Sequence, residues 1–174
     1  MVILRPTRKL HGPLPISGAV QAASTTALGD WYDNRIIVDR RPLLILVSST
    51  SLLPLLTPAR DVCGLPGRLA DLVATRLKRL GIARKLIDAE LQAMAPVELA
   101  PTIDRSVLGI MVDFAKCLPF FLDVGGWDDT TLPFIEARLA KTPCRAGRRS
   151  DQVIFPEQAA PALLAARWEA GSPT

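Results

Sequence analysis

Apolar residues are most concentrated in residues 43–47, where five consecutive positions carry leucine, isoleucine or valine. This run starts after Pro42 and ends at serine and threonine residues, so its length suits a strand that is buried on both faces. Aromatic and β-branched residues precede it, and a short charged connection joins the two segments. The pattern predicts a hairpin of strands over residues 30–38 and 42–48 at the middle of a sheet.

Helical periodicity, with apolar residues at three- and four-residue steps, recurs in the second half of the chain. The predicted helices cover residues 67–80, 83–94, about 107–122, a segment that begins at Thr130 or Thr131, and 157–168. Gly81 is expected to join the first two helices as a helical hairpin, because glycine readily ends a helix. Pro119 is expected to kink or end the third.

The remaining segments are shorter. They are predicted as strands over 2–4, 96–100 and 153–155, a helical turn at 7–10, a loop over 12–29, a short helix over 49–56 and a frayed tail over 170–174. The long loop is unusual in a compact domain, which raises the prospect that it covers a functional surface. We predict one α+β domain over residues 1–169, with a small, mostly antiparallel sheet built on the central hairpin and helices packed on it. The alternative is a mixed sheet with helices on both faces.

Composition narrows the class of protein further. The chain has 174 residues, of which 49% are hydrophobic and 5% aromatic, which fits a globular domain with an aliphatic core. Its net charge of +4 is too mild to identify a nucleic-acid-binding protein. Cys63, Cys117 and Cys144 are widely spaced, which favours a reducing cytoplasm over a disulfide framework. We expect neither a secretory signal nor a membrane span.

Most motifs of known chemistry are missing from the sequence. His11 is the single histidine, so a zinc site built on two histidines is excluded, and a catalytic triad would have to use this residue. We interpret His11 as an exposed loop residue. The sequence has no GxSxG elbow and no glycine-rich phosphate loop. We therefore expect no cofactor.

Carboxylates are the more informative polar residues. Asp30, Asp33 and Asp39 flank the central hairpin, and Asp104 and Asp113 flank the start of the helix at 107. Two such groups that converge could bind a divalent metal through oxygen. The alternative, which we favour, is that these residues cap helices, form turns or face solvent.

One face of the predicted helix at 107–122 is polar. Gly109, Asp113 and Lys116 share this face, and Arg105 lies just before it. A small residue next to a carboxylate allows a ligand or another backbone to approach closely. Arg105 and Asp113 are candidates for a buried polar network, and the alternative is an exposed helix face.

Four short motifs carry a resemblance to a known family. They read LGDWY at 28–32, RSVLG at 105–109, LRPTRKL at 4–10 and TPC at 142–144. Together they resemble a small bacterial and archaeal domain of unknown function that is sometimes encoded on plasmids, and the resemblance covers residues 3–145. In that family's pattern asparagines stand at three positions that Ile103, Asp104 and Val112 occupy in this chain.

The resemblance and the polar positions together define a candidate binding site. Its residues are Arg5, Lys9, Asp30, Trp31, Tyr32, Arg105, Ser106 and Asp113. The first hypothesis is a non-catalytic cytoplasmic binding or interaction module whose protein partner is encoded nearby. Plasmid occurrence suggests a mobile-element or toxin–antitoxin-like setting.

The alternative hypothesis is a metal-assisted enzyme that acts on a phosphorylated or nucleic-acid substrate. Asp30, Asp33 and Asp113 would hold Mg²⁺ in such an enzyme. Arg5, Lys9 and Arg105 would bind phosphate. This hypothesis requires the hairpin start and the 105–113 turn to converge.

A basic segment over residues 138–149 is a candidate for nucleic-acid binding. Its five positive residues, with no acid among them, are Arg138, Lys141, Arg145, Arg148 and Arg149. The dipole of the preceding helix accounts for the first two. The last three either contact nucleic-acid phosphates or are merely solvated.

If these arginines contact phosphates, the protein binds nucleic acid weakly at low salt and loses it at physiological salt. Changing Arg145, Arg148 and Arg149 to Ala should then flatten the slope of log affinity against log salt by up to about 3 units. Fluorescence anisotropy with a labelled duplex measures that slope. An unchanged slope in the triple variant would show that the arginines are merely solvated.

Overall fold

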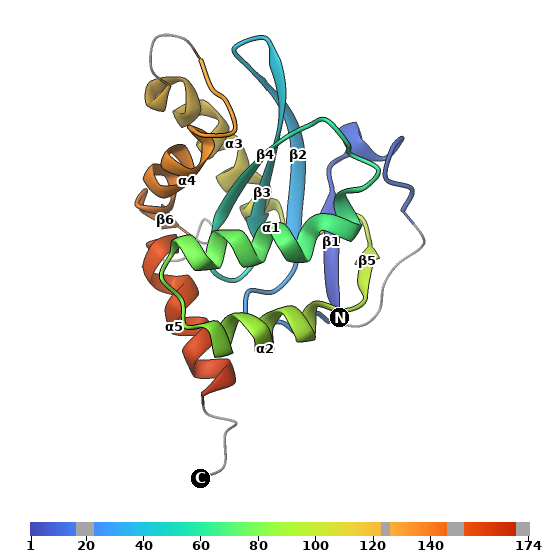
Figure 1. The fold of residues 1–174 in the computed structure, drawn as a ribbon. Coiled ribbons are helices and arrows are strands. Elements are labelled where there is room, and N and C mark those ends of the chain that lie inside the picture. The colour runs from blue at the N-terminus through green and yellow to red at the C-terminus, as the bar shows by residue number, and fades with distance from the viewer. Residues whose placement is uncertain (17–22, 123–125, 146–151, 170–174) are drawn as a thin grey trace.

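A five-stranded sheet in the order β4-β3-β2-β1-β5 lies at the centre of the structure (Figure 1). The computed structural model describes residues 1–16, 23–122, 126–145 and 152–169. The strands are β1 (Val2–Pro6), β2 (Trp31–Val38), β3 (Arg41–Ser48), β4 (Pro54–Pro58) and β5 (Val97–Leu99). β2, β3 and β4 pair antiparallel, whereas β1 pairs parallel with both β2 and β5. This confirms the predicted α+β class, with mainly antiparallel pairing built on the central hairpin.

The β2–β3 hairpin closes through a two-residue turn. Asp39 and Arg40 both have positive φ, 50° and 60°, and the register runs from Val38 opposite Arg41 to Trp31 opposite Ser48. Positive φ at both central residues is the geometry that matches the right-handed twist of the paired strands. The hairpin lies where the hydrophobic pattern predicts it.

Helices cover both faces of this sheet, a feature of the alternative architecture. The 3₁₀ turn η1 (Arg8–Leu10) is followed by α1 (Leu65–Arg79), α2 (Arg84–Met94), α3 (Arg105–Phe121), α4 (Leu132–Ala140) and α5 (Pro156–Trp168). Leu44 and Leu46 of β3 pack in a core with α1, α2 and α5. Leu43, Ile45 and Val47 pack in a second core with α3 and α4. The uninterrupted apolar run of β3 therefore serves two hydrophobic cores at once.

Several local predictions are wrong or only partly right. The segment 49–56 does not form a helix, because the chain turns back at Leu52, whose φ is +57°, and β4 begins at Pro54. The buried Ser48 and Ser51 hydroxyls, 2.5 Å apart, fix that turn, and each also accepts from the Leu53 amide. Pro119 lies inside α3 rather than ending it.

Some further features complete the described fold. A two-stranded pair, β6 (Cys144–Arg145) with β7 (Val153–Ile154), precedes α5. No helix among the described residues is long and apolar enough to cross a membrane. The predicted tail 170–174 and residues 17–22 of the predicted loop lie outside the described residues.

Two side chains close part of the outer edge of β4. Glu136 of α4 accepts a hydrogen bond from the Leu56 amide at 2.8 Å, and Arg76 of α1 donates from Nε to the Pro54 carbonyl at 3.1 Å. Arg76 Nε also lies 3.7 Å from Glu136 Oε2. Both side chains are buried, and burial raises the pKa of Glu136 and lowers that of Arg76. The ion pair thus ties helices from the two faces of the sheet together around its edge.

Replacing Glu136 by Ala should destabilise the fold by about 3–5 kcal/mol, because it leaves the Arg76 charge buried without a counter-charge. The Leu56 amide loses its acceptor as well. Urea denaturation measures the loss. Asp129→Ala is the control, since Asp129 pairs with Arg60 at an exposed position and should matter little. A loss for Glu136→Ala no larger than for this control would contradict the structural role.

Candidate functional site

Arg5 and Asp30, two of the predicted site residues, form a largely buried ion pair. Arg5 Nε lies 2.5 Å from Asp30 Oδ2, and Arg5 Nη1 donates to the Pro101 carbonyl at 2.7 Å. Asp30 Oδ1 accepts from the Ser24 hydroxyl at 2.6 Å, and the Asp30 amide donates to Ser49 Oγ at 2.9 Å. These contacts tie β1 and the start of β2 to three loops, so the charges serve to hold the chain rather than to face a ligand.

Tyr32 and Ser106 both contact Asp104, the residue that precedes α3. The Asp104 amide donates to the Tyr32 hydroxyl at 3.2 Å, and the Asp104 carboxylate caps the helix by accepting from the Ser106 amide at 2.7 Å. Burial raises the pKa of Tyr32 above its ordinary value. Trp31 is also buried, but it packs in the core on the opposite face of the sheet. The LGDWY and RSVLG motifs therefore meet at a structural junction between β2 and α3.

Arg105 and Asp113 do not join that junction through a hydrogen bond or an ion pair in the described part of the chain. Both side chains are exposed, and Asp113 Oδ1 lies 3.6 Å from Lys116 Nζ on the same helix. Among the described residues, no group of three or more His, Cys, Asp or Glu side chains is arranged to hold a metal. The polar face of α3 lies on its solvent side.

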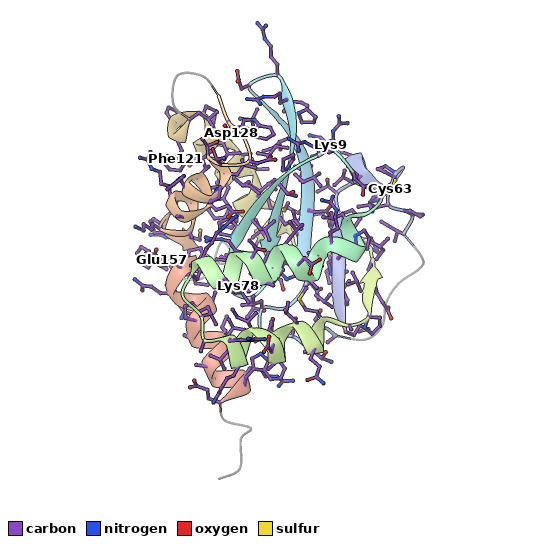
Figure 2. All side chains as sticks on the ribbon, viewed as in Figure 1. Lys9, Cys63, Lys78, Phe121, Asp128 and Glu157 are labelled. Carbon is purple, nitrogen blue, oxygen red and sulfur yellow. The ribbon has the colours of Figure 1, made fainter. Side chains whose placement is uncertain are left out.

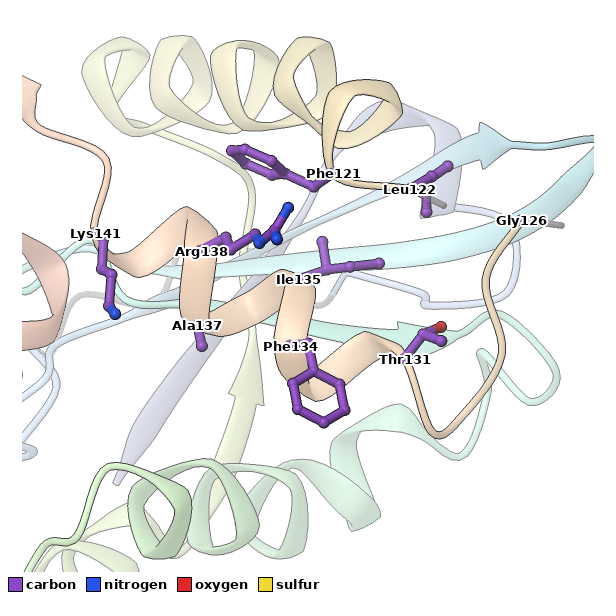
Figure 3. A pocket seen from close by; sticks show the side chains of 9 residues that line it. All are labelled: Phe121, Leu122, Gly126, Thr131, Phe134, Ile135, Ala137, Arg138 and Lys141. Carbon is purple, nitrogen blue, oxygen red and sulfur yellow. The ribbon is translucent and has the colours of Figure 1, made fainter. Parts of the chain in front are cut away.

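The basic segment borders a cavity of about 400 Å³ between α3 and α4 (Figure 3). Arg138 and Lys141 line it, and the Arg138 guanidinium lies 5.8 Å from the centre of the Phe121 ring. Arg145 is exposed in β6. Arg148 and Arg149 lie outside the described residues.

A second feature is the open edge of β2. β1 pairs with β2 only as far as Pro6 opposite Asp33, whereas β2 continues to Val38. Among the described residues, 34–38 therefore have a strand neighbour on one side alone, and at the end of the strand the Trp127 indole donates to the Val38 carbonyl at 2.8 Å. Figure 1 shows this end of the hairpin projecting past β1.

The register fixes which backbone groups face the open side. The tight turn makes Val38 and Arg41 a hydrogen-bonded pair, so the next pair, Ile37 and Pro42, is a non-hydrogen-bonded one. The Ala59 amide bonds to the Pro42 carbonyl at 3.2 Å, which shows that Pro42 directs its backbone toward β4. Ile37, and by the same alternation Arg35, direct their amide and carbonyl groups away from β3.

A groove of about 630 Å³ lies between this part of β2 and α3. Its lining comprises Lys9, Asn34, Ile36, Ile37, Val38, Asp39, Val112, Ala115, Lys116, Pro119 and Leu122. We call this the β2–α3 groove. Ile37 is 63% exposed. Phe120, the residue after Pro119 in α3, is 84% exposed. Lys9, labelled in Figure 2, is the one predicted site residue in the described part of the chain that lines it.

Sequence reasoning overlooked this groove, although one signal was present. Ile36, Ile37 and Val38 are consecutive apolar residues, and side chains alternate between the faces of a strand. Three consecutive apolar residues therefore cannot all face the same core, and at least one apolar side chain is expected on the other face of the strand. The place where β1 stops relative to β2 depends on their pairing register, which no local pattern encodes.

The fold places the chain among α+β proteins with a mixed five-stranded sheet. A family model described as a domain of unknown function, DUF6933, matches residues 3–159. The chain belongs to this family. No curated protein and no solved structure matches the chain with significance.

Asp33, a carboxylate considered for metal binding, is instead fully buried in the sheet. Its strand neighbours are Pro6 and Leu46, and neither carboxyl oxygen has a hydrogen-bond partner in the described part of the chain. Burial raises the pKa of Asp33 to about 7. The folded protein therefore retains a proton there under conditions in which the unfolded chain has released it.

This proton makes stability depend on pH. An aspartate in the unfolded chain has a pKa of about 4. The free energy of unfolding should therefore fall as the pH rises from about 4 to about 7. Asp33→Asn should remove that fall, which amounts to at most about 4 kcal/mol. Urea denaturation across this pH range tests it. Asp39→Asn, at an exposed turn, is the control and should keep the fall. An undiminished fall in Asp33→Asn would contradict the assignment.

Proposed function

We propose that this protein is a non-catalytic, cytoplasmic interaction module that binds an extended segment of a partner protein along the open edge of β2. The observation that carries the proposal is the exposed strand edge over residues 34–38, which runs beside the β2–α3 groove. An extended peptide can add a strand to such an edge, and adjacent pockets then select its side chains.

Two kinds of contact favour a peptide in this groove. The outward backbone groups of Arg35 and Ile37 offer hydrogen bonds to an added strand. Ile37, Val112 and Pro119 offer apolar surface to alternate side chains of that strand. An exposed edge with apolar residues is otherwise an aggregation hazard that proteins avoid or cover, so a covering partner accounts for both features.

Charge indicates the composition of the bound segment. Lys9 and Lys116 line the groove, Arg35 is exposed next to it, and Asp39 is the one acid among the described residues of the lining. Asp39 lies 3.8 Å from Arg41 Nη2, which offsets its charge. The preferred segment is therefore apolar in its centre and flanked by acidic residues.

We further propose that the partner is encoded near this protein, in a setting linked to mobile elements. Plasmid occurrence of the family that the sequence resembles supports this setting. The product of the neighbouring reading frame is therefore the first candidate ligand to purify.

Peptides selected from a random display library against the protein provide a defined probe. The selected peptides should be apolar with acidic flanks, and Ile37→Pro should weaken their binding at least about 10-fold. The proline removes an outward amide and blocks strand addition, yet it is tolerated on an edge that faces solvent. Isothermal titration calorimetry measures the affinities.

A matched pair of variants separates the groove from general surface hydrophobicity. Ile37→Lys should weaken binding, whereas Ile103→Lys, which changes a slightly more exposed isoleucine outside the groove, should not. Equal binding by wild type and Ile37→Pro would contradict the proposal. A dimer in light scattering that Ile37→Pro abolishes would assign the edge to a second copy of the chain instead.

A further inference from the structure

A second cleft lies at the outer edge of β4, where α1 and α4 approach each other, and it is separate from the β2–α3 groove. Its volume is about 300 Å³. Arg68, Leu72, Thr75 and Arg79 of α1 line one wall. These positions are spaced by four, three and four residues, so they form a single stripe along the helix. Leu56 and Thr57 of β4, with residues of α4, form the opposite side.

Three arginines converge on this cleft from two elements. Arg68 and Arg79 come from the stripe of α1, and Arg60 comes from the connection between β4 and α1. Their contacts with carboxylates differ. Arg60 bonds to Asp129 through both terminal nitrogens at 3.3 and 3.4 Å, whereas Arg79 reaches Glu136 through Nη1 at 3.3 Å.

The charges around the cleft do not cancel. Glu136 is shared between Arg79 and the buried Arg76 behind it, so two guanidinium groups divide a single carboxylate. Arg60 and Arg68 have one carboxylate each, from Asp129 and Asp61. Behind the cleft, Glu157 also acts on Arg76. Among the described residues that line the cleft itself, three arginines face two acids, Asp129 and Glu136, so the lining carries one surplus positive charge where protein atoms partly exclude water. Such a surplus attracts an anion.

The Arg68 side chain provides a second, independent observation in favour of a ligand. Its Nε atom is buried, and it has no hydrogen-bond partner among the described residues. The nearest ion-pair contact, with Asp61 Oδ2, spans 4.0 Å, which is too long for a hydrogen bond. A buried N–H group without an acceptor is rare in folded proteins and calls for one.

We propose that this cleft, which we call the β4 cleft, binds the phosphate group of a small phosphorylated ligand or free phosphate. Guanidinium groups match phosphate oxygens through paired hydrogen bonds, and Arg68 supplies them at one end of the stripe on α1. Arg79, about three turns further along the same helix face, adds positive charge to the cleft. Thr57 and Thr75 add hydroxyl groups on either side. The volume suits a phosphate with a small substituent rather than a polymer.

Titration of ¹⁵N-labelled protein with inorganic phosphate tests the site, with sodium chloride at equal ionic strength as the reference. Phosphate should shift the Arg68 Nε–H resonance and the amides of Thr57 and Thr75, and chloride should not. Glycerol 3-phosphate and glycerol form a second arm. Tighter binding of the ester than of phosphate would indicate a phosphorylated small molecule, and the reverse would indicate free phosphate.

Arg68→Gln should weaken phosphate binding at least about 10-fold, because it removes the unpartnered donor and one charge. Arg79→Gln should act in the same direction and guards against a folding defect in one variant. Arg84→Gln is the matched control, since Arg84 is an exposed arginine of α2 outside the cleft. Absence of phosphate-specific shifts, or equal weakening by Arg84→Gln, would overturn the proposal.

Discussion

The backbone groups of every strand need hydrogen-bond partners, and this requirement governs how the two sides of the sheet are built. β3 is satisfied on both sides by β2 and β4. β1 is satisfied by β2 and β5, but it stops at Pro6 while β2 runs on to Val38. Because β2 is longer than β1, its far end has an open edge. In the described part of the chain, no helix side chain hydrogen-bonds to the backbone groups of this edge in place of a strand.

The opposite edge shows how the same requirement can be met internally. Along β4, Glu136 and Arg76 take the place of another strand, and they bring helices from both faces of the sheet together. Arg79 also pairs with Glu136, and with Arg60 and Arg68 it gives the described lining of the β4 cleft a surplus positive charge. One edge is thus closed by an ion pair that also shapes an anion site, and the other is left available to a peptide.

Much of the fold could be predicted from the sequence, because its strongest signals are local. The apolar run of β3 and the periodicity of α1 located the central hairpin and the helical hairpin to within a few residues. The segment before β4 could not be predicted, because its turn depends on a positive φ at Leu52 and on buried serine hydroxyls. The candidate site was harder. Arg5, Asp30 and Tyr32 do lie at one junction, but their contacts are with the protein itself, and the grooves arise from strand register and helix placement.

Hydrogen exchange of the free protein tests the open edge most directly. The register directs the amides of Asn34 and Ile36 toward β3 and those of Arg35 and Ile37 away from β3, toward the open edge of β2. Nuclear magnetic resonance can follow all four amides in one experiment. The account predicts strong protection at Asn34 and Ile36 and rapid exchange at Arg35 and Ile37. Equal protection at all four would show that this edge of β2 is already covered and would contradict the account.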